Sequence, residues 1–304
     1  MANFFRITDN KLSSIGSVDK LGFDEISGYF IPNDYLQSKE FTVMRTCHGI
    51  GDWCIISAIP RLLKLKYPDC KVYVPSKIML KNIFGSMLNT WGYGTYNSEN
   101  ITSDVFKYNP YVDKFIDNID GEIYHDHYRI YNSTDSKIPL AEQMLMFWQF
   151  NENEFSDSMP EIYFGEEDIV DIKYKNKYGY ISVSSTYGKT SDGEEIVNYI
   201  KNIDISDWYY YGENKIEDTN LNFLKNVIDV KSMNLTIRQQ MYLKANAELN
   251  IGNETGLNLW STRYSKTVVL GNKYYGLNHG GVNQGKPRKD PFSSGNFIRN
   301  VIYI

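Results

Sequence analysis

The first group of residues that could do chemistry is a glycine turn with one carboxylate, Gly49-Ile50-Gly51-Asp52, between an apolar strand-like segment and an apolar helix-like segment. Glycines in a strand-to-helix turn let backbone N–H groups face a ligand, and the N-terminal end of a helix favours an anion. The turn is not a complete Gly-x-Gly-x-x-Gly motif, because Cys54 stands where the third glycine would be. Asp52 therefore has two interpretations: it belongs to a ligand site, or it is an N-cap that accepts hydrogen bonds from the first helical N–H groups.

A second candidate site is the polar end of the segment ISVSSTYGKT, residues 181–190. A strand that ends in Ser184 and Ser185 and leads into Lys189 and Thr190 offers hydroxyl groups, free N–H groups and a mobile cation. These groups suit a phosphate or a diphosphate, although an ordinary polar loop after a strand has the same composition.

The third candidate site is the segment NIGNETGLNLW, residues 250–260, in which a short strand-like run ends at Asn253 and continues into Glu254, Thr255 and Gly256. A helix that starts within this turn would place Thr255 and Gly256 near its positive end. Open α/β folds bind ligands at the carboxyl edge of the sheet, so this turn is a second candidate anion site.

The tail at residues 279–300 is rich in glycine and locally basic. Lys286, Arg288 and Lys289 are candidates for a loop that closes over a diphosphate or an anionic acceptor. A solvated surface loop is the alternative interpretation.

His125 and His127 would share one face of a strand and could be taken as a metal-binding pair. A third ligand is not evident, so a solvated loop or strand is the favoured interpretation.

The elements that must position these residues alternate between strands and helices. In the first half, a strand at 41–46, a helix at 53–66 and a strand at 71–76 predict a parallel pair, and Pro60 should kink the helix or delay its start. The first half also shows a strand-like unit and an apolar helical pattern, at 113–118 and 139–150. The second half repeats the alternation, with strands expected at 178–185, 207–213, 250–253 and 266–272 and helices at 195–203 and 236–249. The pattern predicts an α/β fold class.

A length of 304 residues suggests about two domains, and 42% hydrophobic residues are enough to form a core in each. The acidic, polar stretch 151–169 is the best boundary between them. We predict an N-terminal extension, 1–38, packed on the first domain, a first domain at 39–160 and a second at 161–304.

The bulk composition excludes several classes of protein. A net charge of −5 does not fit a strongly basic nucleic-acid binder. Cys47, Cys54 and Cys70 form neither a disulfide framework nor a zinc spacing. No apolar run reaches the roughly 18 residues of a membrane helix, and the first residues are too polar for an export signal. We therefore expect a cytoplasmic location.

Three segments, taken in order, resemble the heptosyltransferase-like glycosyltransferases of glycosyltransferase family 9. GIGDWCIISAIPRLLKLKYPDCKVYV (49–74) looks like the N-terminal signature of that family, with its Gly-x-Gly-Asp turn and its proline-containing helix. YNPYVDKFID (108–117) is similar to the Asn-Pro-Tyr-Val-Asp segment of the family, and GNETGLNLWSTRYSKTVVLGN (252–272) to its C-terminal signature. The resemblance extends over residues 41–272.

The resemblance implies a GT-B fold, with two Rossmann-like domains that face each other across a cleft, the acceptor domain first and the donor domain second. It implies inverting, metal-independent transfer of a sugar from a nucleotide-diphosphate sugar to an acceptor hydroxyl, without a cofactor. Asp52 stands at the position of the general base of the family, and Lys189 matches the loop that contacts the donor phosphates. The expected donor contacts are Gly49, Gly51, Ser184, Ser185, Thr190, Glu213, Asn253, Glu254, Thr255 and Gly256.

The partners implied by the family are a nucleotide sugar and a glycan or glycolipid acceptor, such as a surface glycan or a lipopolysaccharide-type molecule. The sugar is left open among hexose, heptose and pentose. A peripheral position at the inner face of the membrane is the alternative to a free cytoplasmic location.

The third segment departs from the family pattern. Glu254 replaces an Asp, Leu259 stands where a His is usual, and Lys266 replaces a Pro. These changes motivate one alternative function, a non-catalytic nucleotide-sugar-binding protein. The basic tail motivates another, a viral glycosyltransferase that acts on a hydroxymethylated DNA base, although the net charge of −5 disfavours it. The sequence contains no Asp-x-Asp pair, the usual signature of metal-dependent glycosyltransferases of the GT-A class, and this supports metal-free chemistry.

Overall fold

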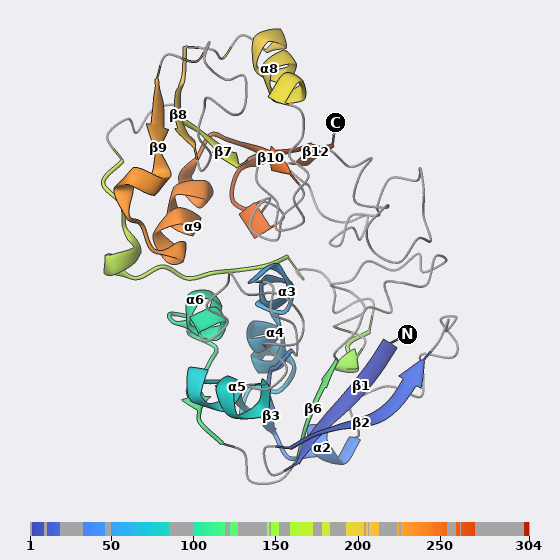
Figure 1. Ribbon diagram of the computed structural model, residues 1–304. Coiled ribbons are helices and arrows are strands. Elements are labelled where there is room, and N and C mark those ends of the chain that lie inside the picture. Colours follow the sequence, from blue (N-terminus) through green and yellow to red (C-terminus); the bar gives the residue numbers. More distant parts are fainter. Residues whose placement is uncertain are drawn as a thin grey trace. The chain divides into compact units, whose positions relative to one another are not determined.

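The computed structural model describes residues 2–8, 11–18, 33–45, 50–84, 100–118, 122–126, 145, 147–151, 159–172, 178–182, 193–203, 205, 207–212, 224, 226–253, 260–261, 263–270 and 301–303. The chain forms two compact units. The first contains Met1–Tyr163 and Lys289–Phe297, and the second contains Phe164–Arg288 and Ile298–Ile304. Figure 1 shows the elements of each unit. None of the described helices is long and apolar enough to cross a membrane.

A parallel sheet of three strands forms part of the first unit, in the order β3-β4-β5. The strands are β3 (Glu40–Thr42), β4 (Lys71–Pro75) and β5 (Lys114–Ile116). Phe41, Val72 and Val74 are completely buried in it. The predicted parallel pair and the predicted strand at 113–118 are thus confirmed.

The helix predicted between the first two strands is divided into α3 (Ile50–Ile55) and α4 (Ile59–Lys66). Pro60 lies in the first turn of α4, where a residue without an N–H group costs no helical hydrogen bond. The expected late start at the proline is therefore confirmed, and α3 is a separate short helix before it.

Other helices of the first unit lie outside the predicted set. They are α2 (Asn33–Gln37), α5 (Lys77–Phe84) and α6 (Ile101–Phe106). Of the helix predicted at 139–150, Leu145 and Phe147 are helical, and much of the remainder is outside the described residues.

An antiparallel sheet contains most of the described part of the N-terminal extension. Its order is β2-β1-β6, with strands β1 (Ala2–Thr8), β2 (Lys11–Val18) and β6 (Glu122–Asp126). Thr8 pairs with Lys11, so only Asp9 and Asn10 separate the two strands in the chain. Asp and Asn favour tight turns, and this dipeptide is the signal by which the hairpin could have been predicted.

The second unit contains a six-stranded sheet in which every neighbouring pair is parallel. The strands, in spatial order, are β12 (Val301–Tyr303), β11 (Lys266–Leu270), β10 (Leu249–Asn253), β7 (Tyr178–Ser182), β8 (Tyr209–Gly212) and β9 (Val227–Asp229). All strands predicted in this half are confirmed. β9 and β12 were not predicted, because a run of three residues is too short to show an alternating pattern.

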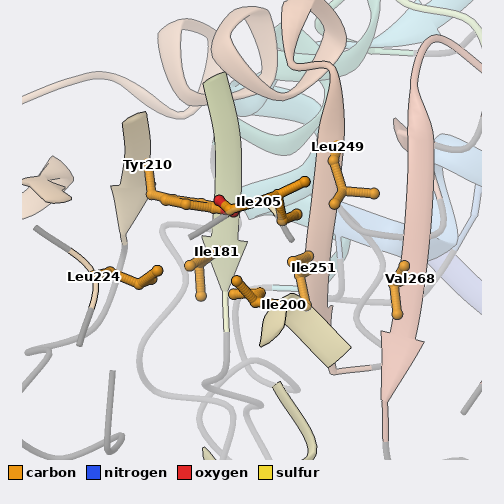
Figure 2. Packing of buried hydrophobic residues seen from close by; sticks show 8 residues of the cluster. All are labelled: Ile181, Ile200, Ile205, Tyr210, Leu224, Leu249, Ile251 and Val268. Carbon is orange, nitrogen blue, oxygen red and sulfur yellow. The ribbon is translucent and has the colours of Figure 1, made fainter. Parts of the chain in front are cut away.

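Helices cover both faces of this sheet. α8 (Gly193–Asn202) contributes Ile200 to one face, where it joins apolar side chains of four neighbouring strands. Figure 2 shows this cluster: Leu224, Tyr210, Ile181, Ile205, Ile200, Ile251, Leu249 and Val268. α9 (Ile237–Asn246) packs Leu243 on the other face, against Tyr178, Tyr180 and Tyr211. Strand residues alternate between the two clusters, as expected for a sheet buried on both sides.

Candidate functional site

The order of the second sheet contains a reversal between β7 and β10. The chain lays down β7, β8 and β9 in one direction and then returns to place β10, β11 and β12 on the other side of β7. In open α/β sheets, ligands bind outside the carboxyl ends of the strands at such a reversal. The topology therefore makes the ends of β7 and β10 the candidate binding edge of this unit.

Two of the three candidate segments follow β7 and β10 and therefore begin at this edge of the sheet. Ser182, the last residue of β7, pairs with Gly252 of β10, so the segments that follow both strands begin at the same level of the sheet. Asn253 is the last residue of β10 and is placed here by its backbone. The other predicted donor contacts of these segments lie outside the described residues: Ser184, Ser185, Lys189, Thr190, Glu254, Thr255 and Gly256.

Glu213 follows directly after β8, which neighbours β7 on the side away from β10. The residue itself is outside the described residues, as are Lys286, Arg288 and Lys289 of the tail. Their predicted roles stay predictions.

In the first unit, Asp52 is the third residue of α3, which follows the carboxyl end of β3. Because α3 begins at Ile50, Asp52 lies in the first helical turn and is not the N-cap residue. A carboxylate in this turn still interacts favourably with the helix dipole. Gly51 is half-buried, while Gly49 and the side chain of Asp52 are outside the described part of the structure.

Packing of an apolar face sets the position of α3. Ile50, Trp53 and Cys54 are buried, with the i, i+3, i+4 spacing of one helical face. The ring of Trp53 meets Phe106 of α6 edge to face, with 6.4 Å between the ring centroids. The helix that carries Asp52 is thus packed against α6 through Trp53.

The segment that resembles Asn-Pro-Tyr-Val-Asp has a structural role at the opposite end of the sheet. Asp113 precedes β5, and its Oδ2 accepts hydrogen bonds from Lys64 Nζ and from the backbone N–H of Val72, each at 2.7 Å. Lys64 Nζ also donates to the carbonyl of Cys70 at 2.6 Å. Burial raises the pKa of Asp113, but the hydrogen bonds from Lys64 and Val72 and the charges of Lys64 and Lys71 hold it below its usual value.

A polar pair that was not predicted from the sequence, Ser76 and Asp117, lies at the carboxyl edge of the first sheet. Ser76 follows β4, and its Oγ donates to Oδ1 of Asp117, which follows β5, at 2.5 Å. The same Oγ accepts the backbone N–H groups of Ile78 and Met79 and so caps α5. A Ser at the end of the predicted strand 71–76, just before an apolar run, was the available signal.

His125 lies in β6, where its backbone is opposite Phe5 of β1, and His127 is outside the described residues. Across the part of the chain that the structure describes, no group of three His, Cys, Asp or Glu residues could hold a metal ion.

A search of solved structures found two that are similar to this chain. One is ADP-heptose lps heptosyltransferase II of E. coli, with 10% identity, a TM-score of 0.49 and coverage of 87% of this chain and 89% of that chain. The other is a glycosyl transferase family 9 structure from Veillonella parvula DSM 2008, with 12% identity, a TM-score of 0.50 and coverage of 87% of this chain and 85% of that chain. No protein-family model and no curated protein matches the sequence. The second likeness confirms the predicted family 9 resemblance and GT-B fold class at the level of the fold.

Proposed function

We propose that this protein is an inverting, metal-independent glycosyltransferase that moves a sugar from a nucleotide-diphosphate sugar to an acceptor hydroxyl. The acceptor we propose is a surface glycan or a lipopolysaccharide-type glycolipid.

The observation that carries the proposal is the strand order of the second unit. The segment after β7 contains Ser184, Ser185, Lys189 and Thr190, and the segment after the adjacent strand β10 contains Thr255 and Gly256, both at the reversal of the sheet. N–H groups, hydroxyl groups and a cation at one edge suit a diphosphate. The likeness to a family 9 structure supports the same assignment through the fold.

The proposed reaction is a single displacement at the anomeric carbon. Asp52 takes the proton of the acceptor hydroxyl while that oxygen forms the new glycosidic bond from the face opposite the leaving group. The bond between the anomeric carbon and the diphosphate breaks, and its electron pair leaves with the diphosphate. Lys189, with Ser185, Thr190 and the turn at Thr255 and Gly256, stabilises the negative charge that grows on this leaving group.

The decisive experiment separates donor binding from turnover. A panel of nucleotide sugars that includes UDP-glucose, ADP-glucose and GDP-mannose is screened by thermal shift, with and without EDTA. A donor should raise the Tm by mass action, to the same extent in both conditions. A shift that EDTA abolishes would contradict the metal-independent mechanism.

With the donor that binds, we expect Asp52→Asn to lose at least a hundredfold in kcat for nucleoside diphosphate release, since a general base contributes about 10²–10⁴-fold. The Tm shift produced by the donor should persist in this variant. Lys189→Ala should instead weaken both donor binding and kcat. Full activity of Asp52→Asn would show that the base is a different residue.

A further inference from the structure

The corner between α3 and α4 is built around one buried hydroxyl. Ser57 is completely buried, and both its backbone N–H and its Oγ donate to the carbonyl of Cys54, at 3.1 and 2.6 Å. Cys54 lies in the last turn of α3, so this serine closes the C-terminal end of the helix that carries Asp52.

The same hydroxyl also binds a segment that is distant in the sequence. Ser57 Oγ accepts the backbone N–H of Glu161 at 2.8 Å. The hydroxyl therefore donates in one direction and accepts in the other, and it joins α3 to the segment that ends the first unit at Tyr163.

Glu161 is attached to the corner at a second point. Its buried carboxylate accepts a hydrogen bond from Arg61 Nε of α4 at 2.8 Å and another from Tyr163 Oη at 3.2 Å. Breaking a buried charge pair of this kind is costly, so the segment is firmly seated on α4.

A third segment touches the corner from the loop after α6. Asn109 Nδ2 donates to the carbonyl of Ser57 at 3.4 Å, and Asn109 Oδ1 accepts the backbone N–H of Tyr111 at 2.9 Å. Asn109 belongs to the segment that resembles the family's Asn-Pro-Tyr-Val-Asp, and its buried amide holds the corner from the side of α6.

We propose that Ser57 is a positioning residue that acts through α3 to keep Asp52 in its reacting geometry, an inference that rests on the proposed function. α3 spans six residues, which is too short to be stable by itself, so its direction depends on contacts with neighbouring segments. Trp53 packs the helix against Phe106 of α6, and the Ser57 hydroxyl ties its C-terminal end to Glu161. A displacement of about 1 Å at a reacting group costs on the order of a hundredfold in rate.

The test compares Ser57→Ala with a matched control, Ser265→Ala. Ser265 is also buried, and its Oγ donates to the carbonyl of Lys244 at 3.0 Å in the second unit. Both variants lose a buried hydroxyl and should unfold at a lower urea concentration than the wild type. We expect Ser57→Ala to lose at least tenfold in kcat with an unchanged KM for the donor, and Ser265→Ala to keep the wild-type kcat. Equal kcat values for the two folded variants would overturn the positioning role.

Hydrogen exchange gives a readout that does not depend on turnover. In Ser57→Ala, the amides of Ile56 and Ser57, which close the end of α3, should exchange at least tenfold faster than in the wild type. The amides of β4 should keep their rates, and Ser265→Ala should leave α3 unchanged. Unchanged exchange at α3 in Ser57→Ala would refute the inference by itself. A wild-type protein without transferase activity would contradict the proposed function, and the exchange rates would then decide whether Ser57 holds α3.

Discussion

Asp113 connects helix α4 to the strands of the first sheet through a single carboxylate oxygen. That oxygen accepts one hydrogen bond from the ammonium of Lys64 and another from the backbone of Val72. The side chain is 29% exposed, so solvent screens part of the attraction. The role of this residue is to fix the edge of the sheet opposite the proposed reacting edge.

At the residue scale, we predict that Asp113→Asn lowers the free energy of unfolding by about 1 kcal/mol at pH 7. The folded-state pKa of Asp113 lies below the unfolded value of about 3.9, so its contribution is complete above that pH and is lost as the pH falls through the folded pKa. Urea unfolding at pH 7 and pH 3 should therefore show a smaller difference between variant and wild type at the lower pH. Asp69→Asn, an exposed aspartate nearby, is the control and should match the wild type. A difference for Asp113→Asn that grows on acidification would contradict this prediction.

At the scale of the elements, β7 and β8 approach each other closely around a glycine. A Cβ atom at Gly179 would lie 2.5 Å from Tyr210 Cε1 and 2.7 Å from Cδ1. The Tyr210 ring is completely buried, and its hydroxyl donates to the carbonyl of Ile205 at 2.8 Å. The ring therefore has little freedom to move aside.

We predict that Gly179→Ala destabilises the second unit by about 1–3 kcal/mol, the usual cost of overpacking a core. The measurement is a double-mutant cycle with Tyr210→Leu, which removes the ring atoms that the new methyl group would meet. The double variant should lose less stability than the sum of the two single variants. Additive losses would show that the ring is not the obstacle.

At the scale of the whole molecule, the chain enters its second unit through a segment anchored by a buried ion pair. Asp168 lies in the short 3₁₀ helix η4 (Glu166–Asp168), and both of its carboxylate oxygens accept from Arg238 of α9, at 2.6–3.0 Å. Asp168 Oδ2 also accepts the backbone N–H of Gly165, and Gln239 donates to the carbonyl of Glu167. Five residues after Tyr163, where the first segment of the first unit ends, Asp168 thus fixes the chain to the second unit.

We predict that Asp168→Ala costs the second unit about 3–5 kcal/mol, because it leaves the Arg238 guanidinium buried without its partner carboxylate. The double variant Asp168→Leu with Arg238→Met should recover a large part of this loss, since no uncompensated charge stays buried. Urea unfolding, followed by far-UV circular dichroism, gives both values. A double variant as unstable as Asp168→Ala would show that the pair stabilises the entry segment through its geometry and not through its charge balance.

The local pattern of apolar residues was sufficient to predict the longer helices and strands. The apolar runs at 178–185 and 266–272 and the helical spacing at 236–249 predicted β7, β11 and α9, because burial on a sheet face or a helix face leaves a periodic trace. Turn composition was also sufficient to select the two segments at the edge of the second sheet, and the three motifs in order were sufficient to indicate the fold.

Other features depend on contacts between segments that are distant in the sequence. β12 is a strand because Val301–Tyr303 pairs with β11. A run of three residues is too short to predict a strand from its sequence pattern. The adjacency of β7 and β10, which brings two candidate loops to one edge, follows from the strand order. Pro60 predicted the break between α3 and α4. The corner itself depends on a hydrogen bond between Ser57 and Glu161, which are 104 residues apart. The sequence by itself determined which residues are candidates for the reaction, and only the tertiary structure decided that Ser57 joins the end of α3 to Glu161, since the partners of a buried hydroxyl lie far away in the sequence.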